Sequence, residues 1–132
     1  MIPHGLDWGI IHGDAFSANA RITSDNQVMW YDLDFCGSGW RALDLAHAAA
    51  SARDHEDDHA SVWSAFLRGY RSRRSISEND LAVIPFLSAA ADIWSMSINL
   101  ARGPIDGFEW LGDRFFDNRL TWLRESVAIY RM

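Results

Sequence analysis

The pattern of apolar residues changes once along the chain, at the small-residue segment Gly37-Ser38-Gly39, and this change limits the folds that the chain can adopt. Before the segment, short apolar runs alternate with glycine and polar turn residues, which is typical of strands and loops. After it, apolar and alanine-rich stretches recur at helical spacing to the end of the chain. We therefore expect the strand-forming region to end at this segment. The predicted fold class is mainly α with a small β-hairpin region.

The helical part contains several recognisable boundaries. Ser77 and Asp80 form the pattern of a capping box, in which the Ser77 side chain accepts from the Asp80 backbone amide. Pro85 should then lie close enough to a helix start to be tolerated, and Gly103-Pro104 should end the same helix. The expected helices cover residues 40–53, 62–70, 81–101 and 113–130.

The N-terminal part contains two runs of strand-like composition, at residues 20–23 and 28–31. The connection between them, Ser24 to Gln27, is rich in turn residues, so the two runs predict a β-hairpin. Such a hairpin would return the chain so that Asp32 lies beside Asn19.

Composition excludes several classes of protein. A length of 132 residues fits one domain. The net charge of −6 argues against nucleic acid or an anionic membrane as a partner, because both attract basic surfaces. Charged residues interrupt the apolar runs before the roughly 20 residues that a membrane span needs, so no span is predicted. The single Cys36 cannot form an internal disulfide, and we expect a cytoplasmic protein.

Three polar residues carry the strongest chemical signal. Asp14 and Asn19 lie five apart in the pattern H-G-D-x-x-x-x-N, and Asp32 follows at the end of the second strand-like run. Carboxylate and amide oxygens suit a magnesium ion that holds phosphate oxygens, while the remaining carboxylate faces an attacking hydroxyl. The alternative is three polar residues in turns that share no ligand.

The sequence around these residues resembles that of a known family. Gly13 stands where protein kinases carry arginine, and Asp32-Leu33-Asp34 leads through Gly37 and Gly39 to Asp44-Leu45-Ala46. This arrangement is similar to the aminoglycoside phosphotransferase and choline kinase family of the protein-kinase-like superfamily, and most similar to its bacterial homoserine-kinase-like members. The resemblance implies the C-terminal lobe of a protein-kinase-like fold.

The resemblance also implies roles for individual residues. Asp14 would be catalytic, as the base for the substrate hydroxyl or as the group that orients it. Asn19 and Asp32 would bind magnesium and, through it, the nucleotide. Asp34 would be a further metal ligand, or hold nearby backbone, or face the substrate. Structural support would come from the remaining motif residues, His12, Gly13 and Asp44.

For the organisation of the chain, the resemblance implies a catalytic loop and metal-binding hairpin over residues 1–39 and a helical subdomain over residues 40–132. We expect the N-terminal nucleotide lobe to be absent, because no glycine-rich loop precedes the motif and all 12 basic residues are arginine. The phosphate-pairing lysine of the family is therefore missing, and the chain alone is expected to be inactive. Apolar surface left by a missing lobe predicts self-association, as a dimer.

Two functions remain open. The first is part of a phosphotransferase that uses magnesium to transfer the γ-phosphoryl of ATP or GTP to a hydroxyl of a small molecule. The second is a non-catalytic helical association domain that keeps the motif as a relic. The acceptor stays open among choline, homoserine, an aminoglycoside, another sugar or a protein hydroxyl. His55 and His59 have the spacing of a zinc pair on a helix, but a solvated acidic helix start is favoured because no Cys or third His stands nearby.

Overall fold

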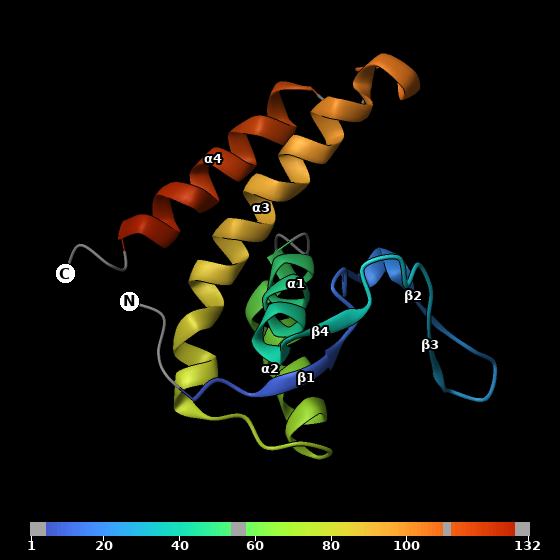
Figure 1. The fold of residues 1–132 in the computed structure, drawn as a ribbon, viewed down its shortest axis with the longest axis vertical. Helices are drawn as coiled ribbons and strands as arrows, with labels where there is room; N and C mark the ends of the chain where they lie inside the picture. The colour runs from blue at the N-terminus through green and yellow to red at the C-terminus, as the bar shows by residue number, and fades with distance from the viewer. Residues whose placement is uncertain (1–4, 54–57, 110–111, 129–132) are drawn as a thin grey trace. The chain divides into compact units, whose positions relative to one another are not determined.

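The computed structural model describes residues 5–53, 58–109 and 112–128, and it shows a small β-region followed by helices (Figure 1). The prediction of a mainly α fold with a small β-region is confirmed. The elements are, in chain order, β1 (Trp8–Ile11), the 3₁₀ helix η1 (Ser17–Asn19), β2 (Ala20–Ile22), β3 (Val28–Trp30), β4 (Gly37–Trp40), α1 (Arg41–Arg53), α2 (His59–Arg71), α3 (Glu78–Asp106) and α4 (Asp113–Ala128).

The chain divides into two compact units, Met1–Ser88 and Ala89–Met132, and the boundary falls inside α3. The first unit holds all the strands together with α1, α2 and the start of α3. The second holds the rest of α3 and α4. The expected single domain, with its division after Gly39, stays a prediction.

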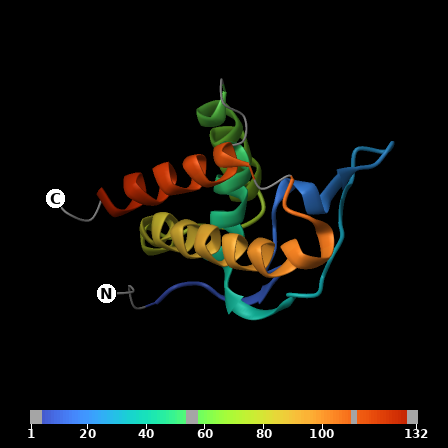
Figure 2. The same cartoon turned by 90° about the horizontal axis from the view of Figure 1, so that it is seen from above.

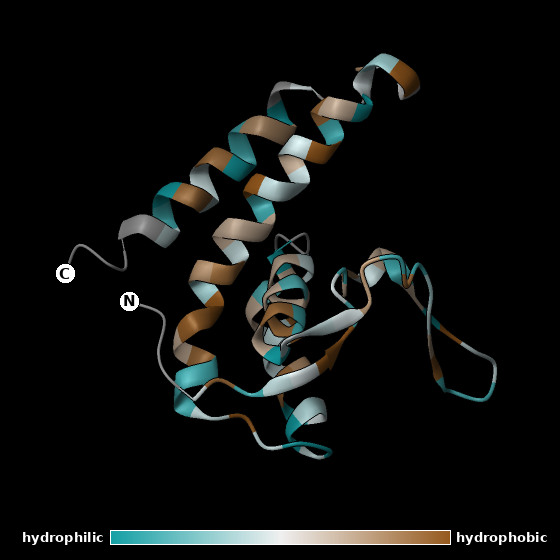
Figure 3. Cartoon of the chain, viewed as in Figure 1, coloured by the Kyte–Doolittle hydropathy of each residue, from teal (hydrophilic) through white to brown (hydrophobic). Residues whose placement is uncertain are grey.

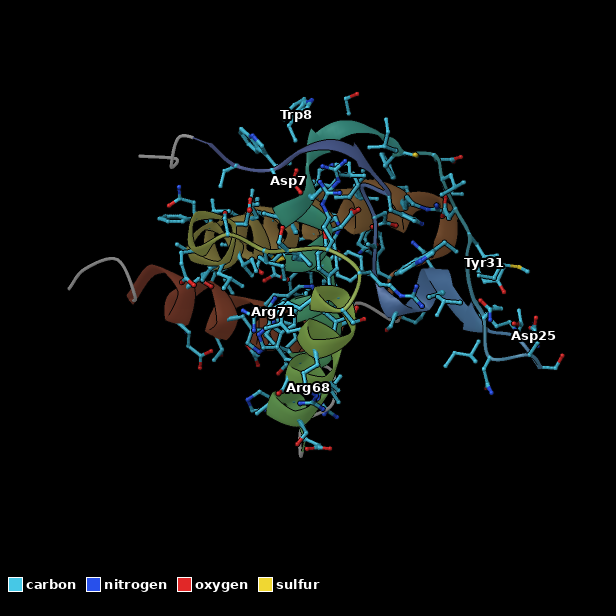
Figure 4. The ribbon with its side chains drawn as sticks, turned by 90° about the horizontal axis from the view of Figure 1, so that it is seen from below. Asp7, Trp8, Asp25, Tyr31, Arg68 and Arg71 are labelled. Carbon is cyan, nitrogen blue, oxygen red and sulfur yellow. The ribbon has the colours of Figure 1, made fainter. Side chains whose placement is uncertain are left out.

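Strands β2 and β3 form the predicted hairpin. They pair antiparallel in the register Ala20↔Trp30 and Ile22↔Val28. The turn between them includes Asn26 at φ 59°, a left-handed conformation that asparagine tolerates better than most residues. Figure 4 shows Asp25 at the tip of this hairpin, away from the helices of the first unit.

The glycine-rich segment that precedes α1 is itself a strand, so the expectation that Gly37-Ser38-Gly39 ends the strand region is wrong. It forms β4, which pairs antiparallel with β1 in the register Gly9↔Gly39 and Ile11↔Gly37. Gly39 is needed at this position, since a Cβ there would lie 2.4 Å from Ile11 Cδ1. The missing side chain therefore gives Ile11 room to pack between the strands and α1.

The core of the first unit joins α1 to α2 and to the start of α3. Leu45 and Ala46 of α1 pack against Ile84 of α3, and all three are buried. Trp63 and Phe66 of α2 cover this cluster with rings stacked at 5.6 Å between centroids. The alanine-rich surface of α1 permits this close approach, because small side chains let helices pack at short distance.

Helix α3 begins with the predicted capping box. The Asp80 backbone N–H donates to Ser77 Oγ at 3.0 Å, and Asp80 Oδ2 accepts from the Ser77 backbone N–H at 3.3 Å. Because α3 starts at Glu78, Pro85 lies well inside it and not in a first turn, contrary to the prediction. The helix is buried on both sides of Pro85, at Val83 and at Ser88.

The predicted stop at Gly103-Pro104 is also wrong, because α3 continues to Asp106. Gly103 serves packing instead: a Cβ there would lie 1.9 Å from the Phe108 ring. The helix is closed by Gly107, which adopts φ 84° and donates its backbone N–H to the Gly103 carbonyl at 2.9 Å. A glycine in this left-handed conformation is a common helix terminus.

In the second unit, the later part of α3 and helix α4 run side by side, as both views show (Figures 1 and 2). On α4 the Arg119 guanidinium lies 3.8 Å from the centroid of the Phe115 ring, a cation–π contact.

Helix α3 is apolar along most of its length (Figure 3). In the described part of the chain it is the one helix with the length and composition to cross a membrane. This is weak evidence for a span, because the core helix of a soluble protein passes the same test. Its first turns pack in the core of the first unit, and Asp92 stands in its middle.

We predict that Ser77→Ala lowers the free energy of unfolding by about 1 kcal/mol, the usual cost of losing a capping side chain. The variant leaves the Asp80 backbone N–H without its acceptor at the start of α3. Urea unfolding followed by tryptophan fluorescence measures the change. Ser75→Ala is the matched control, since Ser75 is exposed in the loop before the helix. Equal unfolding midpoints for the two variants would contradict the role of the cap.

Candidate active site

Three of the motif residues, His12, Gly13 and Asp14, lie in residues 12–17, which lead from β1 into the start of η1 and are called the Asp14 loop here. Asn19 follows as the last residue of η1. Gly13 turns the chain at φ 80°. A Cβ at Gly13 would lie 2.3 Å from the carbonyl oxygen of Phe35, which is a backbone atom and cannot rotate away. Glycine is therefore required at this position both by the conformation and by the close approach of the segment after the hairpin.

Asn19 fixes the position of Asp14. Its side-chain Nδ2 donates to Asp14 Oδ2 at 2.7 Å and to the Asp14 carbonyl oxygen at 2.9 Å. Both of these bonds use the nitrogen of the amide. The Asn19 Oδ1 is left with no donor among the described residues, so it remains available to a ligand.

Polar side chains on one face of α1 accept hydrogen bonds from the backbone of the Asp14 loop. Asp44 accepts from the backbone N–H of His12 through Oδ2 at 2.8 Å and from that of Gly13 through Oδ1 at 2.9 Å. Both carboxylate oxygens are thus used on two successive amides. Such bonds to a charged acceptor are stronger than bonds between neutral groups.

Two further α1 residues continue this pattern. His47 Nδ1 accepts from the Ala15 N–H at 3.2 Å, and Ser51 Oγ accepts from the Ser17 N–H at 2.9 Å. Together with Asp44 they form a row, called the α1 acceptor row here, whose spacings of three and four residues place it on a single helical face. His47 is 1% exposed, and burial lowers its pKa below the usual 6.5.

Neither His47 nor Ser51 is predicted from the sequence as part of the site. Both stand in an alanine-rich helix, where the only signal is that polar residues follow Asp44 at helical spacing. That spacing indicates a shared face, but it does not say that the face meets the backbone of a loop far away in the sequence.

His12 ties the Asp14 loop to the hairpin. Its Nδ1 accepts from the Asp14 N–H at 3.3 Å, and its Nε2 lies 2.8 Å from the carbonyl oxygen of Tyr31. Because Nδ1 is an acceptor, the ring proton is on Nε2, which donates to Tyr31. The His12 ring also lies 5.2 Å from that of Trp30. His12 thereby holds backbone on both sides of the site.

The hairpin returns the chain to Asn19. The Tyr31 N–H donates to the Asn19 carbonyl oxygen at 2.9 Å, one residue beyond the last strand pair. Asp32 follows directly, at φ 54°, an unusual conformation for a residue other than glycine. Figure 4 shows Tyr31 on the arm of the hairpin that leads into this turn.

The side chains proposed as metal ligands have suitable chemistry. Asp32 and Asp34 are exposed, and no described residue donates a hydrogen bond to either carboxylate. Their carboxylates and Asn19 Oδ1 are hard oxygen donors, the kind of ligand that magnesium prefers. In the described ranges, no three His, Cys, Asp or Glu side chains form a ready-made metal cage. Magnesium in phosphoryl-transfer sites does not need one, because phosphates and waters complete its shell.

Two open pockets lie beside the site and not within it. One, of about 410 Å³, is lined mainly by apolar side chains that include Ile10, Trp30 and Leu33. The other, of about 530 Å³, shares Ile10 and Trp30 and reaches Arg73 and Arg74. Both touch Asp44, but neither includes Asp14, Asn19 or Asp32.

An ion-pair cluster secures the start of β1 beside α1. Asp7 accepts from Arg41 Nη1 at 2.7 Å and from Arg74 Nε at 2.7 Å, and its backbone N–H donates to Asp80 Oδ1 at 2.9 Å. The hydrogen bond from Arg74 holds the pKa of Asp7 below its usual range. Figure 4 shows Asp7 next to Trp8 at this end of β1. The strand that leads into the Asp14 loop is therefore fixed at its far end.

The zinc alternative has no structural test, because His55 lies outside the described residues. His59 is exposed in the first turn of α2.

We predict that Asp44→Asn destabilises the protein by about 1–3 kcal/mol, the usual cost of leaving a buried or half-buried donor unpaired. The substitution puts an amide –NH₂ against the backbone N–H of either His12 or Gly13. Urea unfolding measures the effect. Asp58→Asn is the control, since it removes the same charge at the N-terminus of α2, where Asp58 makes no capping hydrogen bond. Wild-type stability in Asp44→Asn would show that the carboxylate does not hold the loop.

Comparison with known proteins agrees with the motif. A family model described as phosphotransferase enzyme family matches residues 1–79. The chain is 40% identical over 124 residues to an uncharacterized protein of Deinococcus radiodurans, covering 92% of this chain and 36% of that protein. No solved structure gives a significant match.

Several of the similar relatives are named homoserine kinase. The one from Granulibacter bethesdensis is 35% identical over 92 residues, with 67% of this chain and 28% of that protein covered. The one from Brucella ovis is 30% identical over 112 residues, with 83% and 32% covered. The chain spans about a third of the length of these relatives. The family match covers the Asp14 loop, the hairpin and the α1 acceptor row, and it shows that the chain belongs to the phosphotransferase enzyme family.

Proposed function

We propose that this chain is the C-terminal lobe of a phosphotransferase that moves the γ-phosphoryl of ATP or GTP to a hydroxyl of a small molecule. The observation that carries the proposal is the pairing of Asn19 with Asp14 through the amide nitrogen. This pairing fixes a carboxylate and leaves an amide oxygen free at the start of a hairpin whose other arm ends at Asp32.

In this proposal Asp14 receives the acceptor hydroxyl. One of its carboxylate oxygens, Oδ2, is taken by Asn19 at 2.7 Å, so Oδ1 is the one that orients the hydroxyl or accepts its proton. Phosphoryl transfer depends chiefly on positioning and on neutralising charge. A carboxylate fixed by a side chain and by a fully hydrogen-bonded loop supplies the positioning.

Asn19 Oδ1 and the Asp32 carboxylate would hold magnesium, with Asp34 as a further oxygen donor. The ion, when bound, neutralises the phosphate oxygens of the nucleotide. The chain itself would keep the two ligands together; the strand pairing of β2 with β3 and the bond from the Tyr31 N–H to the Asn19 carbonyl support this role.

We propose that this chain alone is not a complete catalyst. Its residues supply the acceptor and metal side of the reaction, and no lysine is available to pair with the nucleotide phosphates. The names of two relatives make homoserine, an amino acid with a primary hydroxyl, the first acceptor to test. We also infer a cytoplasmic location, supported by the single, exposed Cys36.

The proposal is tested by joining this chain to the part of the Deinococcus radiodurans relative that it does not cover and assaying transfer from ATP and GTP to a panel of hydroxyl compounds. We predict that Asp14→Ala lowers kcat by about 100-fold or more with nucleotide binding retained. Asp32→Ala should instead weaken binding of the magnesium nucleotide.

Asp25→Ala is the matched control for this experiment, because Asp25 is an exposed carboxylate at the tip of the same hairpin (Figure 4). It should keep full turnover. Unchanged turnover in both Asp14→Ala and Asp32→Ala would show that these residues are not the phosphotransfer site.

A second candidate function, self-association without catalysis, is favoured by exposed apolar residues of the first unit. Ile10 is 68% exposed and Val28 is 59% exposed, and both line the larger pocket together with Trp30. Leu33, 57% exposed, lines the smaller pocket with Ile10 and Trp30. We call these four residues the β-region apolar surface. An apolar surface of this kind marks an interaction site on a soluble protein, and we propose that it forms a dimer.

We predict that Ile10→Asp shifts the chain from dimer to monomer, because it places a charge in the β-region apolar surface. Size-exclusion chromatography with light scattering over a range of concentrations measures the mass. Ile105→Asp is the control, since Ile105 is 85% exposed in the second unit and outside this surface. A wild-type monomer at high concentration refutes the dimer, and a response only to Ile105→Asp refutes the surface.

A further inference from the structure

The middle member of the α1 acceptor row is a histidine buried directly beneath the Asp14 loop. His47 Nδ1 accepts from the Ala15 N–H at 3.2 Å. Its ring stacks on Phe16 at 4.6 Å between centroids, with 28° between the planes. His47 therefore holds the two residues that follow Asp14, one by a hydrogen bond and the other by ring contact.

This support depends on the protonation state of the imidazole. Nδ1 accepts a hydrogen bond only while it carries no proton. In the imidazolium form an N–H on Nδ1 would point at the Ala15 N–H, and two donors would face each other. The other two members of the row differ in kind, because Ser51 has no charge to gain and Asp44 accepts through a carboxylate.

The charged groups that face His47 come from the loop and from α1. Asp14 and Asp44 favour its protonation, and His12 opposes it. Burial opposes it more strongly than the carboxylates favour it, so the neutral ring persists below the usual pKa of 6.5. In the unfolded chain His47 takes up its proton near pH 6.5. Its contribution to stability is thus complete above pH 6.5 and is lost as the pH falls from there to the lowered folded-state value.

We propose that His47 is a positioning residue for Asp14: the neutral ring holds the backbone after Asp14 in place, and uptake of a proton releases it. This inference rests on the proposed function, in which Asp14 meets the acceptor hydroxyl. It adds to that function a dependence of the Asp14 position on pH that is set by a residue outside the reacting groups.

The test uses nuclear magnetic resonance on the chain itself, with no nucleotide or acceptor present. The variants are His47→Asn, whose side-chain oxygen replaces Nδ1 as acceptor and does not titrate, and His47→Leu, which offers no acceptor. The first readout is the hydrogen-exchange protection factor of the Ala15 amide between pH 7.5 and 5. The second is the chemical shift of the Asn19 side-chain –NH₂, which reports Asp14 because it donates to Asp14 Oδ2.

In the wild type we expect the Ala15 protection factor to fall about five- to tenfold as His47 is protonated, the size expected for one hydrogen bond. The Asn19 –NH₂ signal should move over the same pH range. His47→Asn should keep Ala15 protected and the Asn19 signal constant throughout. His47→Leu should lose the protection at every pH.

A pH response in His47→Asn equal to that of the wild type overturns the proposal, and so does retained Ala15 protection in His47→Leu. Should a variant fail to fold, the ¹⁵N shifts of the wild-type imidazole decide the question: an unprotonated Nδ1 supports the proposal, and a protonated Nδ1 at pH 7.5 refutes it. Failure of the proposed function is a separate result, seen as unchanged turnover in Asp14→Ala.

Discussion

The hydrogen bonds between the Asp14 loop and the side chains of α1 are the constraint on which the site depends. The loop has no secondary structure of its own until η1, yet its backbone polar groups lie against a helix and need partners. Asp44, His47 and Ser51 accept from four of its amides. Two more are satisfied locally, by His12 Nδ1 and by the Asp14 carbonyl oxygen. Every amide from residue 12 to residue 17 thus has an acceptor.

This arrangement explains why small residues and polar residues are both needed around the Asp14 loop. Gly13 allows the backbone to turn against Phe35, Gly39 allows Ile11 to pack beneath β4, and the alanines of α1 allow α2 and α3 to approach. Small residues bring the backbone close, and polar side chains at helical spacing then reach it. The result is a hydrogen-bonded loop that carries Asp14 and leads to Asn19, where the hairpin returns at Tyr31, one residue before Asp32.

Local patterns in the sequence predicted much of this structure. The hairpin, the capping box at Ser77 and the helical second half are determined by turn residues and apolar spacing within a few positions. Pairing of β4 with β1 was missed, because glycine and serine have low strand propensity and the strand exists only through its partner. The end of α3 is predicted too early, at Gly103. This glycine makes room for the Phe108 ring that packs on it, and Gly107 is the residue that closes the helix. His47 and Ser51 were missed because their partners are backbone amides more than 30 positions away.

Side chains of α1 hold the Asp14 loop, and hydrogen exchange of individual amides in the wild-type chain tests this support most directly. We predict that the amides of His12, Gly13, Ala15 and Ser17 exchange as slowly as those inside α1, and far more slowly than those of residues 24–26 at the tip of the hairpin. Exchange of these four amides at the rate of the hairpin tip would contradict the account.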